Sequence, residues 1–159
     1  SAGGSLLSTG AEMVLFIRKD PCRLVPLWKE DPISFSREFA RLHGIPKWFQ
    51  HAGENGEMHV ENTEAANRDP AVFSDGDTFN PRRQDLNKAI LFNALEEDVL
   101  TGASKTTHRV CLGRNFSLAF LNAIIPHFFP DVECHDGEEV FEGVLFKKEL
   151  VDTTRGKLE

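Results

Sequence analysis

Apolar residues recur with helical spacing along the first third of the chain, where two prolines interrupt the pattern. The spacing predicts three helices, over Leu6–Arg18, Cys22–Lys29 and Phe35–His43. Pro21 and Pro32 mark the breaks, because proline has no backbone N–H and biases the residue before it away from helix. Ser34 is expected to cap the third helix, and Gly44 is expected to end it.

Short extended segments and turns replace the helical pattern after residue 44. The turn-rich residues 53–56 predict a hairpin within Ile45–Thr63. Residues 68–85 carry prolines and several Asp and Asn residues without any period, so we expect an ordered, meandering loop. Asp136-Gly137 predicts a second hairpin near the end of the chain, followed by a strand over Val144–Phe146.

Two further apolar patterns predict helices in the second half of the chain. They cover Leu86–Leu100 and Arg114–Ile125, with a polar loop over residues 102–111 between them. The pattern as a whole predicts a mainly α fold with small β hairpins.

Composition narrows the class of protein further. With 159 residues, 40% of them hydrophobic, the chain is long enough for one globular domain. The net charge of −7 argues against a nucleic-acid partner, which would favour a positive surface. No apolar stretch is long enough for a membrane span, and no secretory signal is visible, so we expect a cytoplasmic protein. The three cysteines suit a reducing compartment, with at least one free thiol.

Two short motifs carry candidate chemistry. Glu38 and Arg41 lie three residues apart on the third expected helix and can pair on one face. Cys111 stands just before the last helix, where the dipole and free N–H groups of a helix start stabilise a thiolate. Gly113 would let the backbone approach a group bound to the sulfur. This arrangement suits a thiolate ligand to heme iron, although a buried cysteine capping a core helix gives the same pattern.

Four motifs follow one another along the chain in a distinctive order. They are the Glu38-x-x-Arg41 helix and the segments Ala65–Phe73, Phe79–Arg83 and Arg109–Arg114. This succession resembles the carboxy-terminal half of the cytochrome P450 family of heme-thiolate enzymes. Ahead of it, Leu6–Glu12 looks like the long central helix that crosses the heme face in that family. The resemblance covers nearly the whole chain and implies a single partial domain over residues 1–159, without the first half of such an enzyme.

The resemblance implies a heme b cofactor and assigns residues to it. Cys111 would be the proximal ligand of the iron, and Arg109 would meet a heme propionate. A further propionate-binding arginine of the family falls at Gln50 here, with His51 and Lys47 as substitutes.

The resemblance also implies a catalytic pair and a structural network. Glu12 matches the acid of the oxygen-activating pair on the central helix. Met13 replaces the neighbouring alcohol, so Thr9, one turn earlier, is the candidate hydroxyl. A buried network is expected to lock the meandering loop beneath the heme, formed by Glu38, Arg41 and Arg83.

The function implied is that of the heme-binding portion of a heme-thiolate monooxygenase, or a peroxygenase-like enzyme, acting on a small apolar substrate. Electrons would come from an external ferredoxin- or reductase-type donor. The alternative is a non-catalytic relative that binds a partner chain and not heme. Ser104 and Thr107, which stand where the family has a phenylalanine and a glycine that shield the thiolate, favour this alternative.

A complementary chain or self-association is a further expectation for such a half-enzyme. The outer sides of the first and last helices carry large apolar residues: Leu15, Phe16, Phe116, Phe120 and Ile124. These residues must pack together, bind another chain or form an exposed apolar patch. Weak heme retention is expected for the isolated chain.

Zinc is the competing hypothesis for the cysteine region. Four nitrogen and sulfur donors, the number and type that tetrahedral zinc takes, occur at His108, Cys111, Cys134 and His135. The spacing of the first two is acceptable, whereas adjacent ligands at Cys134 and His135 fit one ion poorly.

Overall fold

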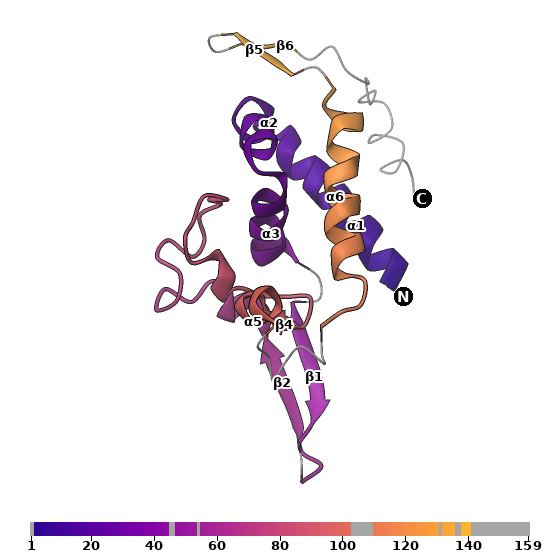
Figure 1. The fold of residues 1–159 in the computed structure, drawn as a ribbon, viewed down its shortest axis with the longest axis vertical. Helices are drawn as coiled ribbons and strands as arrows, with labels where there is room; N and C mark the ends of the chain where they lie inside the picture. Colours follow the sequence, from indigo (N-terminus) through magenta and orange to yellow (C-terminus); the bar gives the residue numbers. More distant parts are fainter. Residues whose placement is uncertain are drawn as a thin grey trace, which may run out of the picture.

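The computed structural model describes residues 2–44, 47–53, 55–102, 110–130, 132–135 and 138–140. The side chains of residues 2–5, 48, 49, 51, 133–135 and 138–140 lie outside this description. Over the described residues the fold is mainly helical, with three small two-stranded antiparallel sheets (Figure 1). The expected fold class, mainly α with small hairpins, is therefore confirmed.

Three helices follow one another at the start of the chain: α1 (Ala2–Arg18), α2 (Pro21–Glu30) and α3 (Pro32–His43). Both α2 and α3 begin with an Asp-Pro pair, in which the aspartate caps the helix and the proline takes its first turn. Asp31 Oδ1 accepts the N–H of Ser34 at 2.9 Å. The expectation that Ser34 itself caps α3 is therefore wrong, because Asp31 offers the stronger acceptor one turn earlier.

Helix α6 (Arg114–Phe128) packs across α1 and α3 (Figure 1). Gly10 allows the close approach of α1, since a Cβ there would lie 3.1 Å from the Phe120 ring and 3.2 Å from Ile124. Asn122 Oδ1 accepts hydrogen bonds from Trp28 Nε1 at 3.2 Å and Ser36 Oγ at 2.7 Å. The main core forms among these four helices, with buried Met13, Ile17, Leu24, Val25, Phe35, Phe39, Leu121, Ile125 and Phe129.

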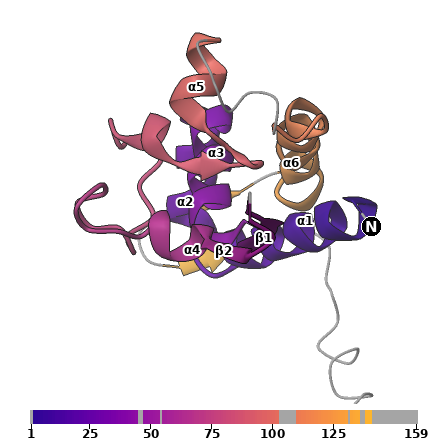
Figure 2. The same cartoon turned by 90° about the horizontal axis from the view of Figure 1, so that it is seen from below.

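A β-hairpin extends away from the helices at one end of the molecule (Figure 1), and Figure 2 views the molecule from that end. Its strands are β1 (Trp48–Ala52) and β2 (Met58–Asn62), paired so that Gln50 faces Val60. This confirms the hairpin expected between residues 45 and 63. A short helix that the sequence pattern did not predict, α4 (Thr63–Ala66), follows at once, because the Asn62 side chain accepts the Ala65 N–H at 2.9 Å.

Residues 67–85 form the irregular, meandering loop that the sequence predicts. A second, smaller core lies between this loop and the end of α3, made of Ala40, Phe73, Leu86, Ala89 and Leu91.

The expected helix over Leu86–Leu100 is wrong. In its place stand four short elements: η1 (Leu86–Lys88), β3 (Ile90–Leu91), β4 (Ala94–Leu95) and α5 (Glu96–Thr101). The turn between β3 and β4 holds Phe92 at φ 52° and Asn93 at φ 70°, and two successive positive φ angles are incompatible with a right-handed helix. Only the last part of the expected span is α-helical.

The chain continues past α6 into a third hairpin, formed by β5 (Glu133–His135) and β6 (Glu138–Val140). A hairpin was expected here, although its turn at residues 136–137 and the expected strand over Val144–Phe146 lie outside the described residues. Among the described helices, none has both the length and the apolar composition needed to cross a membrane.

Candidate functional site

The described residues line a partly open cavity of about 460 Å³ beside the cysteine that the sequence analysis singled out. We call it the cysteine cavity. Its walls come from α1, the end of α3, α4, the β3–β4 turn and the start of α6. Most of the lining is apolar, contributed by residues such as Leu6, Leu42, Leu91, Phe92, Phe116 and Leu121.

Cys111 lines this cavity from the loop that leads into α6. Its thiol is free and the residue is exposed. The Cys111 N–H donates to the Phe92 carbonyl at 2.9 Å, and the Cys111 carbonyl accepts the Arg114 N–H at 2.9 Å. These two backbone bonds fix the loop directly before the first turn of α6.

Gly113 also lines the cavity, as the residue that caps α6. A Cβ at this position would lie 3.7 Å from Cys111 Sγ, an ordinary contact distance. Gly113 is therefore not required by a clash with the sulfur. Its effect is to leave the space beside the thiol open.

Of the two candidate catalytic residues, Thr9 and Glu12, only one lines the cysteine cavity. Thr9 lines the cysteine cavity from α1. Glu12 is exposed and does not line it, and Met13 is fully buried in the main core. Cys111 and Thr9, far apart in sequence, thus face one cavity, whereas Glu12 does not.

Of the candidate propionate-binding residues whose side chains the structure describes, one lines the cavity and one does not. Gln50 is exposed on β1 and does not line the cavity, whereas Lys47 does. Lys47 Nζ lies 3.0 Å from Glu64 Oε1 in an exposed ion pair. Arg109 and the side chain of His51 lie outside the described residues.

The three residues of the expected network meet in the interior. Glu38 is fully buried, and its carboxylate receives Arg41 Nε at 2.7 Å, Arg41 Nη2 at 2.8 Å and Arg83 Nε at 3.0 Å. The backbone N–H of Asn80 donates to the same carboxylate at 3.0 Å. The carboxylate therefore links α3 to the last third of the meandering loop.

Arg41 extends this network toward the cysteine cavity, which it also lines. Its Nη1 group donates to the Asn67 carbonyl and, at 2.7 Å, to the Gly76 carbonyl. Both guanidiniums of the network lie over the Phe73 ring, that of Arg41 at 5.0 Å from the centroid. The Nε, Nη1 and Nη2 groups of Arg41 all donate hydrogen bonds, as a buried guanidinium requires.

Sequence reasoning missed Asn67 and Glu96, two buried polar residues near the cavity. The Asn67 side chain accepts the Ile90 N–H at 2.8 Å and donates to the Ile90 carbonyl at 2.9 Å. Glu96 pairs with Arg37 and Arg114. The sequence marks Asn67 only by its place in the Ala65–Phe73 motif. It marks Glu96 only through its partner Arg114, which directly follows Gly113.

The cysteines differ from the expectation in one respect. Cys111 is a free thiol, as expected for at least one cysteine, whereas Cys22 is disulfide-bonded. Cysteine spacing alone does not reveal pairing. The expected cytoplasmic location stays a prediction.

The zinc hypothesis stays untested at its own residues. His108 and the side chains of Cys134 and His135 lie outside the described residues. Within the part of the chain that the structure describes, no three His, Cys, Asp or Glu side chains gather as a metal site would require.

Comparison with known proteins adds no relative: no protein-family model, curated protein or solved structure matches this chain. The site must therefore be interpreted from its own residues and geometry.

Proposed function

We propose that the cysteine cavity is the heme-binding site of a heme-thiolate protein, with Cys111 as the iron ligand, as the resemblance to the cytochrome P450 family implies. The observation that carries this proposal is that the exposed, free thiol of Cys111 and the hydroxyl-bearing Thr9 line one largely apolar cavity. The buried Glu38–Arg41–Arg83 network next to the cavity supports it.

The residues present fit a porphyrin in three respects. The thiol at the start of α6 is the donor that heme-thiolate iron takes. The apolar walls suit a flat, largely apolar macrocycle. Lys47, one of the substitutes expected for the family's second propionate-binding arginine, lines the cavity with a cation that can pair with a propionate carboxylate.

Each side chain would have a separate task. Bound heme supplies oxygen-insertion chemistry, which a thiolate ligand promotes. Cys111 Sγ would hold the iron, the apolar walls of the cavity would contact the macrocycle, and Thr9 Oγ1 offers a hydroxyl that can hold a proton. Glu12 is exposed, so proton delivery from it depends on a path that begins at the protein surface. A small apolar substrate and an external electron donor complete the proposal.

Titration of the purified chain with hemin tests this proposal. We expect one hemin per chain, and an affinity at least about tenfold lower for Cys111→Ser, since changes to outer partners of a metal ligand already cost about 10- to 100-fold. Ser117→Ala is the matched control, because Ser117 lines the same cavity without a ligating thiol, and should bind like the wild type. Equal affinities for all three proteins would contradict the assignment of Cys111.

A second candidate function is the non-catalytic interaction module. It is favoured by the exposure of Leu112 and Phe116, which are 103% and 67% exposed beside the cavity. On this hypothesis the chain takes up no hemin, and its apolar side associates with a complementary chain or a second copy. The hemin titration separates the two functions, because only the first predicts a stoichiometric complex.

A further inference from the structure

The segment from β3 to α5 contacts the cysteine loop in two places. The Phe92 carbonyl, at the β3–β4 turn, accepts the Cys111 N–H at 2.9 Å. The Glu96 carboxylate, at the start of α5, accepts Arg114 Nε at 3.0 Å and Arg114 Nη2 at 2.6 Å. Arg114 is the first residue of α6, three positions after the cysteine. The loop that carries the thiol is thus held on both sides.

This segment is itself firmly attached to the interior. The side chain of Asn67 makes two hydrogen bonds with the backbone of Ile90, and the Asn67 carbonyl accepts Arg41 of the buried network. The Glu96 N–H donates to the Ala89 carbonyl at 2.9 Å. A continuous series of contacts therefore runs from Glu38 and Arg41 to the residues that hold Cys111.

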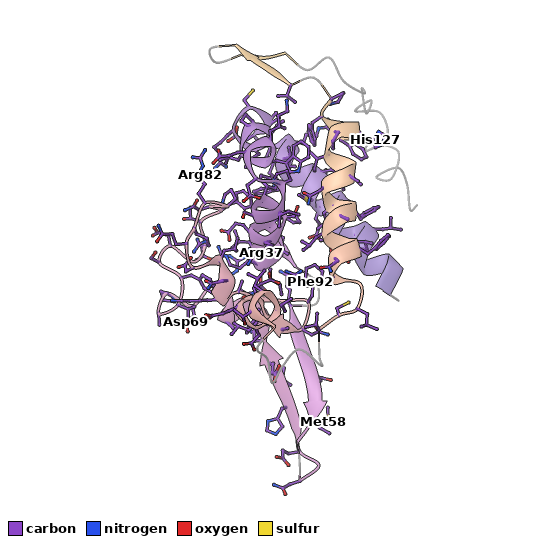
Figure 3. All side chains as sticks on the ribbon, viewed as in Figure 1. Arg37, Met58, Asp69, Arg82, Phe92 and His127 are labelled. Atoms are coloured by element: carbon purple, nitrogen blue, oxygen red, sulfur yellow. The ribbon has the colours of Figure 1, made fainter. Side chains whose placement is uncertain are left out.

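The Glu96 carboxylate is fully buried, and a buried carboxylate is stable only when it is paired. It lies between two guanidiniums, that of Arg114 in a two-bond contact and that of Arg37 on α3. Arg37 Nε lies 2.8 Å from Glu96 Oε2 but outside the angles of a hydrogen bond. Figure 3 shows Arg37 and Phe92 near the same end of α6. Of the two arginines, only Arg114 belongs to the cysteine loop and α6.

We infer that Arg114 is a positioning residue for the Cys111 thiol: its two-bond contact with Glu96 fixes the start of α6 and keeps the cysteine loop hydrogen-bonded to the β3–β4 turn. The role of this positioning in heme ligation rests on the proposed function. The inference predicts an effect on the loop that differs from the effect of the same charge removed from Arg37.

Amide hydrogen exchange of the heme-free protein, measured by NMR, tests the inference directly. In Arg114→Gln, the Cys111 N–H should exchange about tenfold faster or more, because the loop opens locally while the Glu96 carboxylate keeps Arg37 as a partner. Arg37→Gln removes a guanidinium from the same carboxylate but leaves the Arg114 contact, so Cys111 exchange should stay within about twofold of the wild type. A merely structural role for the cluster would raise exchange equally in both variants and would overturn the inference.

A conservative variant keeps the test decisive if Arg114→Gln does not fold. Arg114→Lys retains the charge but loses the two-bond geometry, so Cys111 exchange should still rise severalfold. Unchanged exchange in this variant would count against the inference. Hemin titration of the same proteins separates the two proposals: faster exchange without hemin binding in any of them leaves the positioning role intact and refutes the proposed function.

Discussion

At the scale of single residues, the buried carboxylates determine how the site is built. Glu38 has no exposed surface, and its two oxygens are occupied by two guanidiniums and one backbone N–H. The resemblance to the cytochrome P450 family implied this group of three residues, although not its link to Asn80. A side chain buried in this way contributes through what its loss would leave unpaired.

Removing the charge of Glu38 should destabilise the fold strongly. Glu38→Gln leaves Arg41 and Arg83 buried without a carboxylate, and such a loss typically costs about 3–5 kcal/mol in the free energy of unfolding. Urea denaturation measures it. Glu30→Gln is the control, since it removes an exposed carboxylate from its contact with Arg82 and should leave the urea midpoint nearly unchanged. Similar midpoints for both variants would contradict the account of the network.

His43 provides the pH dependence at this scale. Burial lowers the pKa of His43 below its ordinary value of 6.5, and the cations Arg68, Lys47, Lys19 and Arg41 lower it further. The ring stacks on Phe39 with centroids 4.9 Å apart. The folded state then binds fewer protons than the unfolded state, so the stability due to a neutral His43 is complete above pH 6.5 and is lost as the pH falls below it.

Urea denaturation at pH 8 and at pH 5.5 checks this expectation. His43→Phe should lose less stability than the wild type between the two pH values, because one acid-sensitive group has been removed. His127→Gln changes an exposed histidine and should keep the wild-type pH dependence. If His43→Phe shows the wild-type loss, burial of a neutral imidazole is not the cause.

At the scale of elements, the sequence predicted the helices well where prolines and capping residues mark their ends. Both Asp-Pro breaks stand where helices begin, and α6 begins at the residue expected for it. The prediction of a helix over Leu86–Leu100 failed although the apolar spacing there fits a helix. The reason is that the distant Asn67 side chain makes two hydrogen bonds with the backbone of Ile90. A contact over 23 residues leaves no local signal, so tertiary structure overrides the periodicity.

The β3–β4 turn provides a test at the scale of elements. Asn93 has a φ of 70°, a conformation that asparagine tolerates and β-branched residues do not. Asn93→Val should lower the free energy of unfolding by about 1–2 kcal/mol, whereas Asn93→Gly should stay within about 0.5 kcal/mol of the wild type. Thermal and urea denaturation measure both. Equal tolerance of valine and glycine would show that the turn does not have this backbone conformation.

At the scale of the whole molecule, α1 and α6 each keep large apolar side chains exposed. Leu15 and Phe116 are 57% and 67% exposed, as expected for the outer sides of these helices. Phe16 and Ile124 instead pack against the main core, and Phe120 stacks on Phe116 with ring centroids 6.5 Å apart. Only part of the expected apolar surface is therefore exposed, because the close helix crossing at Gly10 brings α1 against the Phe120 ring and Ile124.

Binding of an apolar fluorescent dye measures this exposed surface. The wild type should bind the dye, and Phe116→Glu should bind it more weakly, because it removes a large apolar side chain from the exposed side. Met58→Glu is the matched control, since Met58 is 63% exposed but lies on the β1–β2 hairpin (Figure 3). Equal losses of dye binding in both variants would show that the dye does not prefer the apolar surface around Phe116.

The central claim is that Cys111 presents a thiolate to a heme in the cysteine cavity. The most direct measurement is the absorption spectrum of the carbonyl complex of the reduced, hemin-loaded protein. We predict a thiolate-type spectrum for the wild type and for Ser117→Ala, and its loss in Cys111→Ser, because the serine oxygen cannot replace the thiolate as an electron donor. A wild type that takes up no hemin, or a Cys111→Ser variant that keeps the thiolate-type spectrum, would contradict the account.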